Sequence, residues 1–386
     1  MKIVVDQRIP FVEEAFGPFG EVVKYDSRGI DNAAVKEADA LLVRSETRVD
    51  EKLLTGSKVG FVGTATIGTD HIDVGFLERH GIAFASAPGC NSNAVVQYVY
   101  SALFTLAERN GFSLRGKTLG VVGVGNIGSK IVRVGHKLDM NILQNDPPLA
   151  RATGDSRFVS LDDLMESDFI TIHVPYTRTG TDPTHHLFDE KRLSMLKKGS
   201  VLINSSRGPV VDNQALKAAL HRATPGMAVL DVWEREPNLD IDLMSKCAIG
   251  SQHIAGYSID GKVNATRMVY EAFCRHFGLE QSWDAGTVIE PPEQPMMPVD
   301  PNYSDPEAVI SALVRKCYDI TKDDASLRKI AELKEEERGA YFKGLRGKYK
   351  FRYEFSNMTV VLPRQDRFLS EALEAFRFKI DYARTA

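Results

Sequence analysis

The sequence predicts an α/β protein with two doubly wound parallel-sheet domains and a small α+β domain at the C-terminal end. Three observations support this prediction. Short apolar runs alternate with amphipathic stretches along residues 1–91 and again along 119–250, as in parallel β-α units. A glycine-rich turn joins a predicted strand to a predicted helix near residue 123. The alternation stops at a proline-rich stretch after residue 284, and a differently patterned segment follows.

The first series of predicted strands covers residues 3–5, 22–25, 41–43, 59–62 and 82–85. Ligands of open parallel sheets bind beyond the carboxyl ends of the strands, so the residues that follow these runs are candidates for binding. Arg44 and Ser45 follow the third run, and Thr66 follows the fourth among small and hydroxyl residues. A guanidinium with hydroxyl and backbone N–H groups suits a carboxylate or a phosphate. A surface ion pair is an equally good explanation of Arg44 taken alone.

A helix predicted over 93–109 leads to the most informative stretch, Gly123-Val124-Gly125-Asn126-Ile127-Gly128, which joins the apolar run 119–122 to a helix over 129–138. This pattern is typical of a dinucleotide-binding loop. Gly123 permits the tight turn, Gly125 the approach of a pyrophosphate, and Gly128 close packing of the helix. Asp146 ends the next run, 141–144, where a carboxylate accepts hydrogen bonds from a ribose and disfavours NADP. A glycine turn in an α/β core is the alternative.

This loop predicts a Rossmann domain that binds NAD, with further strands at 169–172, 201–203, 227–230 and 248–250. Three of the strand ends carry acid–base groups. Arg207 could clamp a substrate carboxylate, and His253 could accept a hydroxyl proton because its ordinary pKa is near neutrality. Glu236 could fix the tautomer of His253, and Asp231 could accept from a nicotinamide carboxamide. Each has a structural explanation when taken singly, but together they favour hydride transfer between a 2-hydroxy acid and a nicotinamide.

The helix predicted over 258–278 is expected to return to the first domain. The predicted domains are therefore 1–93 with 257–284 for the substrate, 94–256 for NAD, a linker over 285–301, and 302–386 for dimerisation. In this last domain the pattern predicts a helix from Pro306, a charged helix over 325–338, a hairpin from the alternation at 351–355 and 359–362, and a helix near 368–378. So few strands make a poor independent core, which favours docking on a second subunit over a mobile regulatory domain.

The composition sets further limits. A net charge of -4 gives no general attraction to nucleic acid or to an anionic membrane, so neither is an expected partner. No apolar run reaches the roughly 18 residues of a membrane span, and the N-terminus does not resemble a signal peptide, so we expect a cytoplasmic protein. The four cysteines have no metal or redox spacing and fit a reducing compartment as small apolar side chains. No histidine has zinc-ligand spacing, so we expect no metal.

The same residues carry a family resemblance. The stretches 123–128, 204–212, 231–237 and 253–256 resemble motifs of the D-isomer-specific 2-hydroxyacid dehydrogenases, and the resemblance covers residues 1 to about 280. It implies a flavodoxin-like substrate domain beside the Rossmann domain. It also implies that Arg207, Glu236 and His253 form the catalytic set.

Further stretches, 43–47, 63–71, 88–94, 145–148 and the C-terminal domain, extend the resemblance over the whole chain to one branch of this family. That branch is homodimeric and oxidises 4-phospho-D-erythronate with NAD to (R)-3-hydroxy-2-oxo-4-phosphooxybutanoate in pyridoxal 5'-phosphate (vitamin B6) biosynthesis. The resemblance implies substrate contacts by Ser45, Thr66 and Tyr257. It implies NAD contacts by the glycine loop, Asp146, Val174, Ser206, Arg207, Gly208, Asp231 and Gly256. Val174 departs from the pattern, because a hydroxyl side chain there would give the cofactor one more bond.

The phosphate site is left open by the sequence. We hypothesise that Arg44 contributes, together with an arginine of the partner's C-terminal domain such as Arg346 or Arg352, because a dianion usually recruits guanidinium groups. Two other functions compete. Another member of the family, such as a phosphoglycerate dehydrogenase, is disfavoured because the C-terminal domain over 302–386, called the tail below together with the linker before it, lacks an obvious β-α-β-β-α-β pattern. A non-catalytic NAD-sensing interaction protein is disfavoured because all three catalytic residues are present.

Overall fold

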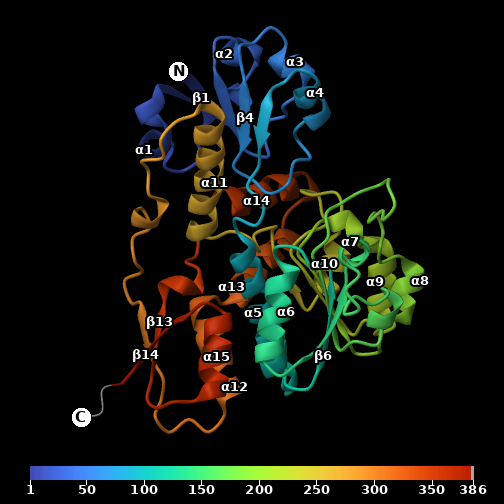
Figure 1. Cartoon of the computed structure of the whole chain (residues 1–386). Coiled ribbons are helices and arrows are strands. Elements are labelled where there is room, and N and C mark those ends of the chain that lie inside the picture. The colour runs from blue at the N-terminus through green and yellow to red at the C-terminus, as the bar shows by residue number, and fades with distance from the viewer. Residues whose placement is uncertain (384–386) are drawn as a thin grey trace. The chain divides into compact units, whose positions relative to one another are not determined.

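Residues 1–383 are described by the computed structural model (Figure 1). Contacts between backbones divide the chain into two compact units. The first comprises Met1–Asn91 and Tyr257–Pro291, and the second comprises Ser92–Gly256 with the residues from Pro292 onward. Each unit holds a large parallel sheet, and the second also holds a small one. The predicted fold class is confirmed.

The first unit contains a five-stranded parallel sheet in the order β2-β1-β3-β4-β5, which is the flavodoxin-like order. Its strands are β1 (Lys2–Asp6), β2 (Glu21–Tyr25), β3 (Ala40–Val43), β4 (Phe61–Thr64) and β5 (Ala83–Ala85). Its helices are α1 (Val12–Phe16), α2 (Asn32–Val35), α3 (Glu51–Leu54), α4 (Val74–Arg79) and α11 (Ile259–Phe277). As predicted, α11 returns to this unit, and Figure 1 shows this helix beside β1. Its residues Tyr270 and Phe273 pack edge-on against Phe16.

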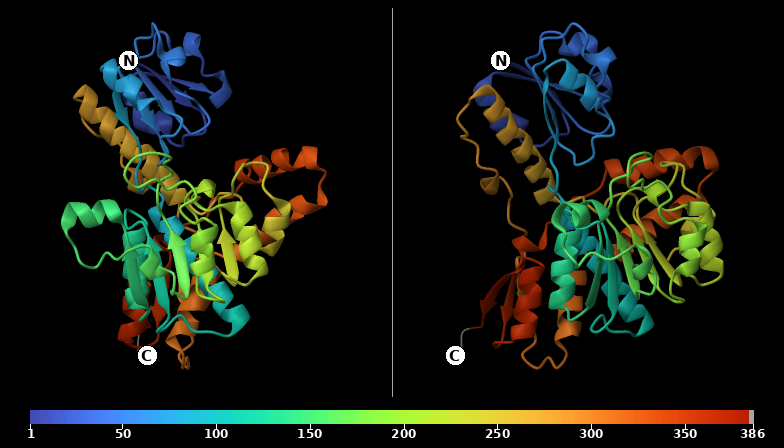
Figure 2. Two further views of the ribbon diagram at one scale, coloured as in Figure 1. Left: turned by 90° about the vertical axis from the view of Figure 1, so that its right-hand side faces the viewer. Right: turned by 45° about the vertical axis from the view of Figure 1, so that its right-hand side comes forward.

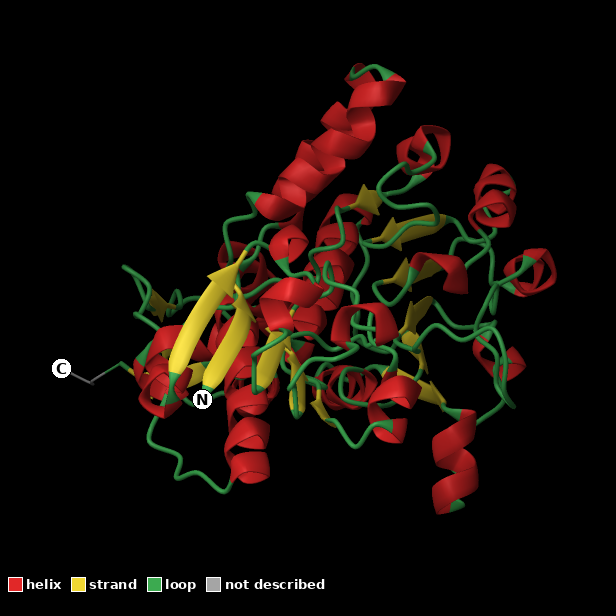
Figure 3. Ribbon diagram, turned by 90° about the horizontal axis from the view of Figure 1, so that it is seen from above, coloured by secondary structure: helices red, strands yellow, loops and turns green. Residues whose placement is uncertain are grey.

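The second unit contains a six-stranded parallel sheet in the order β11-β10-β9-β8-β6-β7, seen in Figure 3 as a row of strands with helices on both sides. Its strands are β6 (Thr118–Val122), β7 (Asn141–Asn145), β8 (Phe169–Ile172), β9 (Val201–Asn204), β10 (Met227–Leu230) and β11 (Ile249–Gly250). Phe158 forms an isolated parallel bridge with Gln144 on the outer side of β7. With that bridge counted as a strand position, the sheet has the Rossmann order 3-2-1-4-5-6 with one further strand.

The helices around this sheet are α5 (Ser92–Asn110), α6 (Gly128–Lys137), α7 (Pro147–Thr153), α8 (Glu190–Met195), α9 (Asn213–His221) and α10 (Ile241–Lys246). Helix α5 is buried almost throughout, from Ala94 to Ala107. A helix buried on all sides needs neighbours on all sides. They include α6 and the C-terminal helices α12 (Pro306–Cys317) and α13 (Ile320–Arg328). Ser101 of α5 donates to the Tyr318 carbonyl at 2.7 Å, so the tail is packed into the second unit.

The rest of the tail comprises β12 (Met296–Pro298), α14 (Glu335–Gly347), β13 (Thr359–Leu362), α15 (Arg367–Ala375) and β14 (Lys379–Tyr382). The three strands form a parallel sheet in the order β12-β13-β14, and α15 lies beside it (Figure 2). The predicted hairpin is therefore wrong, because β13 has only parallel neighbours and residues 351–354 form no strand. The single helix predicted over 325–338 is also wrong, because α13 ends at Arg328 and α14 begins at Glu335.

The alternating pattern at 351–355 misled because residues from both sides of the alternation are buried, among them Phe355 at 0% exposure. Phe351 is 39% exposed, whereas Arg352 is 9% and Glu354 only 2% exposed. Both charged side chains have hydrogen-bond partners in the interior, which is the condition for burying them. Apolar periodicity therefore does not identify a single buried face in this segment.

Two predictions from composition can be compared with the structure. Among the described residues, no helix is long and apolar enough to cross a membrane. None of the four cysteines forms a disulfide among residues 1–383, and Cys90, Cys247 and Cys274 are buried as predicted for small apolar side chains.

Candidate active site

The glycine loop follows β6 and begins α6. Gly123 has a φ of 85°, and a Cβ atom added there would lie 2.7 Å from the His173 carbonyl oxygen. A Cβ atom on Gly128 would lie 2.0 Å from the Gly123 carbonyl oxygen, so both positions require glycine. At Gly125, in contrast, an added Cβ would meet nothing within 4 Å. The loop therefore leaves open space at the one glycine whose predicted task is to admit a pyrophosphate.

Helix α6 begins at the end of this loop. Ile127 precedes the helix and supplies no side-chain cap, and the N–H groups of Ser129 and Lys130 donate to the Gly125 and Ile127 carbonyls at 3.1 and 3.0 Å. The positive end of a helix dipole attracts anions. The dinucleotide contacts expected of Gly123, Gly125, Asn126, Ile127 and Gly128, which lie in this loop and at this helix end, stay a prediction.

Asp146 lies directly after β7 and contacts the same loop. Its Oδ2 accepts from the Val124 N–H at 2.8 Å, and its Oδ1 accepts from the Leu149 N–H at 3.0 Å. The carboxylate thus caps α7 and holds the glycine loop at once. It stands at the edge where a ribose acceptor is expected, and its position is fixed by the chain itself.

The end of β8 closes the other side of the loop. Val174 Cγ1 lies 2.9 Å from the position that a Cβ atom of Gly123 would take. The neighbouring His173 is hydrogen-bonded through Nε2 to the Thr171 hydroxyl at 2.8 Å, and burial lowers the pKa of His173 to about 3. A histidine that stays neutral to such a low pH supports the structure and is unsuited to general acid–base work.

Arg207 lies in a turn after β9 that is ordered by a buried asparagine. Asn204 accepts from the N–H and the hydroxyl of Ser206 at 3.0 and 2.8 Å, and donates to the Arg207 carbonyl at 3.0 Å. Arg207 donates through Nη1 to the Ser206 carbonyl at 2.9 Å. A Cβ atom on Gly208 would lie 2.1 Å from the Trp233 carbonyl, so the Arg207 turn is pressed against the segment that carries Glu236.

Glu236 and His253 are brought into direct contact. Glu236 Oε2 lies 2.8 Å from His253 Nδ1, and Oε1 accepts from the Trp233 N–H at 2.9 Å. Burial raises the pKa of Glu236, but the charge and hydrogen bond of His253, the Trp233 N–H and the charge of Arg346 outweigh it. The pKa of this carboxyl therefore lies below its usual value, and the group is an anion beside the imidazole.

The loop that carries His253 is anchored on Asp231, which follows β10 and is 1% exposed. Its carboxylate accepts from the Ser251 hydroxyl at 2.6 Å and from the N–H groups of Ile254 and Ala255 at 2.8 and 2.9 Å. Its carbonyl accepts from the His253 N–H at 2.7 Å. Asp231 thus orders the residues from Ser251 to Ala255, a contribution that the sequence did not reveal.

The predicted substrate residues belong to the first unit. Strands β3 and β4 are parallel neighbours, with Val43 opposite Thr64, so Ser45 and Thr66 follow at the same edge. Thr66 Oγ1 donates to the Gly68 carbonyl at 3.0 Å and also contacts the Thr64 hydroxyl at 2.8 Å. Tyr257 has the Lys262 ammonium 5.1 Å from its ring centre. The Nε atom of Arg44 is buried and has no hydrogen-bond partner among the described residues.

The two tail arginines considered for a phosphate differ. Arg352 is buried, and its guanidinium donates to backbone carbonyls of its own chain, so it is not available to a phosphate as predicted. Arg346 acts in its own chain on Glu236, as the pKa of that residue indicates. Neither arrangement could be predicted from the sequence, because both depend on how the C-terminal segment packs.

One group of side chains among residues 1–383 has the composition of a metal site, namely His186, Asp212 and Glu234. Asp212 Oδ1 accepts from two N–H groups at the start of α9, and Glu234 Oε2 accepts from the Asn213 N–H at 3.0 Å. His186 Nε2 lies 2.8 Å from Glu234 Oε1. Backbone capping and this contact account for the cluster.

Residues 94–255 match the family described as D-isomer specific 2-hydroxyacid dehydrogenase, NAD binding domain, and residues 289–375 match a domain of unknown function, DUF3410. The chain is 45% identical to an erythronate-4-phosphate dehydrogenase of Chromohalobacter salexigens over 98% of this chain and 99% of that one. It is 42% identical to the enzyme of the same name from Pseudomonas fluorescens, over 97% and 98%.

Solved structures show the same fold over about 72% of the chain. A 3-phosphoglycerate dehydrogenase of Entamoeba histolytica with bound NAD+ has a TM-score of 0.62 and 23% identity, covering 72% of this chain and 95% of that one. A D-lactate dehydrogenase of Aquifex aeolicus with NAD and lactic acid has a TM-score of 0.58 and 25% identity, covering 72% and 96%.

Proposed function

The chain belongs to the erythronate-4-phosphate dehydrogenases, a branch of the D-isomer-specific 2-hydroxyacid dehydrogenases, and from that membership we propose the roles of its residues. It is an NAD-dependent oxidoreductase. Its proposed reaction is the oxidation of 4-phospho-D-erythronate at C2 to (R)-3-hydroxy-2-oxo-4-phosphooxybutanoate, in pyridoxal 5'-phosphate biosynthesis. The observation that carries the proposal is the 2.8 Å contact between Glu236 and His253 beside the Arg207 turn.

His253 is the proposed base. Its Nδ1 lies on the Glu236 carboxylate, and an imidazole that donates through Nδ1 presents the lone pair of Nε2. Nε2 then accepts the C2 hydroxyl proton while the C2–H bond breaks and the carbonyl forms. Glu236 stabilises the imidazolium that results. When bound, NAD supplies the oxidant, because its nicotinamide accepts the hydrogen of C2 with both bonding electrons.

Arg207 is the proposed clamp for the substrate carboxylate and the C2 oxygen. A guanidinium is planar and matches a carboxylate with two parallel N–H groups. The bond from its Nη1 to the Ser206 carbonyl fixes the side-chain orientation. A fixed positive charge beside the C2 oxygen stabilises the charge that develops on this oxygen as the carbonyl forms. The same clamp holds C2 in the orientation that hydride transfer requires.

The proposed NAD contacts are made by the chain's own loops. Gly123, Gly125, Asn126, Ile127 and Gly128 would hold the pyrophosphate, and the open space at Gly125 supports that assignment. Asp146 would accept from the ribose, in addition to the N–H groups that it already holds. The remaining proposed contacts are Val174, Ser206, Arg207, Gly208, Asp231 and Gly256.

The proposed substrate contacts are Arg44, Ser45, Thr66 and Tyr257. Of these, Arg44 is the proposed phosphate ligand. Its Nε atom is buried without a partner among residues 1–383, and a buried donor of this kind gains from an anionic acceptor. A phosphate at Arg44 would distinguish the substrate from unphosphorylated 2-hydroxy acids.

We also propose the domain division 1–93 with 257–284, 94–256, 285–301 and 302–386, and assign dimer formation to the last part. The edge strands β12 and β14 support dimerisation, because they carry Met296 and Tyr382, which are 49% and 44% exposed. Cytoplasmic residence is proposed because four cysteines that form no disulfide among residues 1–383 suit a reducing compartment.

The test is NADH formation with 4-phospho-D-erythronate and 3-phospho-D-glycerate in parallel, with a 2-oxo acid added in one series to reoxidise bound NADH. A clear preference for the four-carbon substrate is expected. Preference for the three-carbon acid would retain the family and reject the substrate. Absence of turnover with every 2-hydroxy acid would favour an NAD-sensing interaction protein.

The role of Arg44 is tested separately. Arg44→Ala should raise the KM for 4-phospho-D-erythronate about 10- to 100-fold, because one charge-assisted bond is worth about 1.5–3 kcal/mol. The KM for an unphosphorylated D-2-hydroxy acid should change much less. An unchanged KM for the phosphorylated substrate would remove Arg44 from the phosphate site.

A further inference from the structure

The loop that carries His253 has an unusual backbone. His253 has a φ of 60°, in the left-handed region that non-glycine residues seldom adopt. Such a conformation persists only where the surroundings hold it. On one side, Asp231 accepts the N–H groups of His253, Ile254 and Ala255. The N–H side of the loop is therefore fixed by a single residue.

The carbonyl side of the same loop is held by the tail. Arg352 Nη2 donates to the Ala255 carbonyl at 2.5 Å and to the Ala94 carbonyl of α5 at 3.1 Å. Its Nη1 donates to the Ile254 carbonyl at 3.3 Å. One guanidinium thus connects the carbonyl groups of Ile254 and Ala255, the two residues after His253, with the first turn of α5. Asp231 and Arg352 hold the same two residues from opposite sides.

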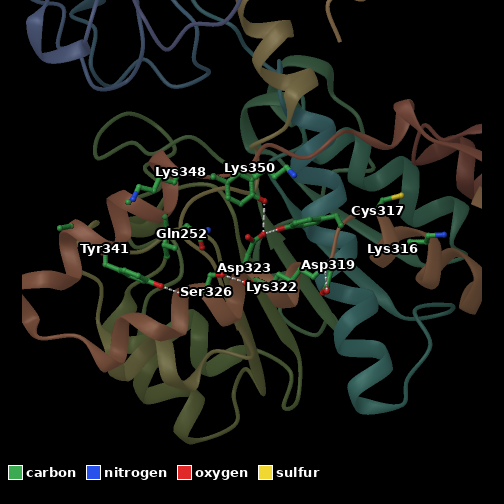
Figure 4. Close-up of a pocket in the computed structure, with 15 residues that line it drawn as sticks. Gln252, Lys316, Cys317, Asp319, Lys322, Asp323, Ser326, Tyr341, Lys348 and Lys350 are labelled. Carbon is green, nitrogen blue, oxygen red and sulfur yellow. Dashed lines mark hydrogen bonds and ion pairs between the residues drawn. The ribbon is translucent and has the colours of Figure 1, made fainter. Parts of the chain in front are cut away.

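The position of Arg352 is itself fixed. Its guanidinium lies 4.0 Å from the ring centre of Tyr318, and Nη1 donates to the Tyr349 hydroxyl at 3.2 Å. Both tyrosine hydroxyls donate to Asp323, at 2.7 and 3.2 Å, and burial raises the pKa of that carboxyl above its usual value. Figure 4 shows Asp323 with these bonds on the wall of a pocket of about 680 Å³ that also includes Gln252, the residue before His253.

We propose that Arg352 is a positioning residue for the catalytic histidine. It holds the carbonyl groups of Ile254 and Ala255, and thereby keeps the His253 imidazole on Glu236 and aimed at the substrate. The inference rests on the proposed role of His253. It assigns to the tail a part in catalysis within one chain, in addition to dimer formation. Arg352 touches neither substrate nor cofactor in this role.

The experiment replaces Arg352 and uses a matched arginine as control. Arg352→Met keeps most of the side-chain volume and removes every hydrogen bond, and Arg352→Lys keeps the charge without the fork. Arg364 makes the same kind of clamp elsewhere in the tail, donating to the carbonyls of Pro301 and Tyr303 at 2.5 and 3.1 Å with its guanidinium 4.2 Å from the Tyr303 ring. Arg364→Met is therefore the control for losing such a clamp.

Rates are expressed per NADH-binding site, counted by fluorescence titration of the full-length protein. Arg352→Met should lower kcat about 10- to 100-fold, because a displacement of the reacting group by about 1 Å costs that much. Arg352→Lys should fall between it and the wild type. Arg364→Met should retain kcat within about twofold, as a contact remote from the reacting atoms should.

A double substitution separates positioning from general damage. If Arg352 acts through His253, then Arg352→Met added to His253→Gln should lower the residual rate by less than about threefold, because the two effects are not additive. An equal loss in both backgrounds would overturn the inference. So would a kcat near the wild-type value in Arg352→Met, or loss of NADH binding in both Arg352 variants, which would make Arg352 a support of the whole unit. Failure of the proposed function itself would be seen differently, as absence of turnover in the wild type.

Discussion

Substitution by alanine at two glycines of the glycine loop, Gly125 and Gly128, should affect thermal stability differently. In Gly128→Ala the new methyl would lie 2.0 Å from the Gly123 carbonyl oxygen, well inside contact distance, so the backbone must move. Overpacking against backbone costs about 3 kcal/mol, which corresponds to a fall in Tm of about 6–12 °C for a unit of this size. In Gly125→Ala the methyl meets no atom within 4 Å, and the Tm should be unchanged or rise by a few degrees.

Gly125→Ala should leave thermal stability intact but weaken the binding of NAD. A methyl there fills the space through which the pyrophosphate would approach, so Gly125→Ala should raise the Kd for NADH about 10- to 100-fold, or about 1.4–2.7 kcal/mol. Thermal melting without cofactor and fluorescence titration with NADH measure the two quantities. A Gly125→Ala protein with the wild-type Kd would refute the assignment of the loop to the pyrophosphate. A Gly128→Ala protein with the wild-type Tm would refute the close contact.

Two further predictions concern titratable groups. Glu236→Gln should lower kcat about 1,000-fold with little change in NADH affinity, because an amide that donates to Nδ1 of His253 leaves the wrong tautomer; a loss below tenfold in steady-state assays would contradict this. His173 has a folded-state pKa of about 3 against 6.5 in the unfolded chain, so stability should fall as the pH drops from 6.5 towards 3, by about 2 kcal/mol between pH 7 and pH 5. His173→Gln should lose most of that dependence in urea unfolding at the two pH values, and an unchanged difference would show that other groups cause it.

The strands of the two large sheets could be predicted because their residues obey a local rule. Buried parallel strands are short continuous apolar runs, as in Leu119–Val122 and Val201–Ile203, and turn residues mark their ends. The same rule placed Arg207, Glu236 and His253 after strands, where open sheets bind ligands. The bridge at Phe158 was not predicted, because a strand position of one residue produces no periodic pattern of apolar residues in the sequence.

The tail could not be predicted in the same way. Its sheet pairs Met296 with Thr359 and Thr359 with Lys379, and such distant parallel pairings have no turn between the strands to signal them. Arg352 and Glu354 are buried by specific partners, Ala255 among them, which a pattern of apolar residues does not contain. The contact of Arg352 with the His253 loop follows from tertiary packing alone.

The parallel tail sheet has a consequence for synthesis of the chain. Strand β12 pairs only with β13, and α12, α13 and α14 are all translated between them. Pairing β12 with β13 closes a long loop, which is slow. During synthesis the backbone groups of β12 therefore stay unpaired and exposed until β13 has been translated. The residues around β12 include Pro291, Pro292 and Pro295, and Pro298 lies within the strand. Proline withholds the N–H that a foreign strand would need, so this stretch resists aggregation until its own neighbour is made.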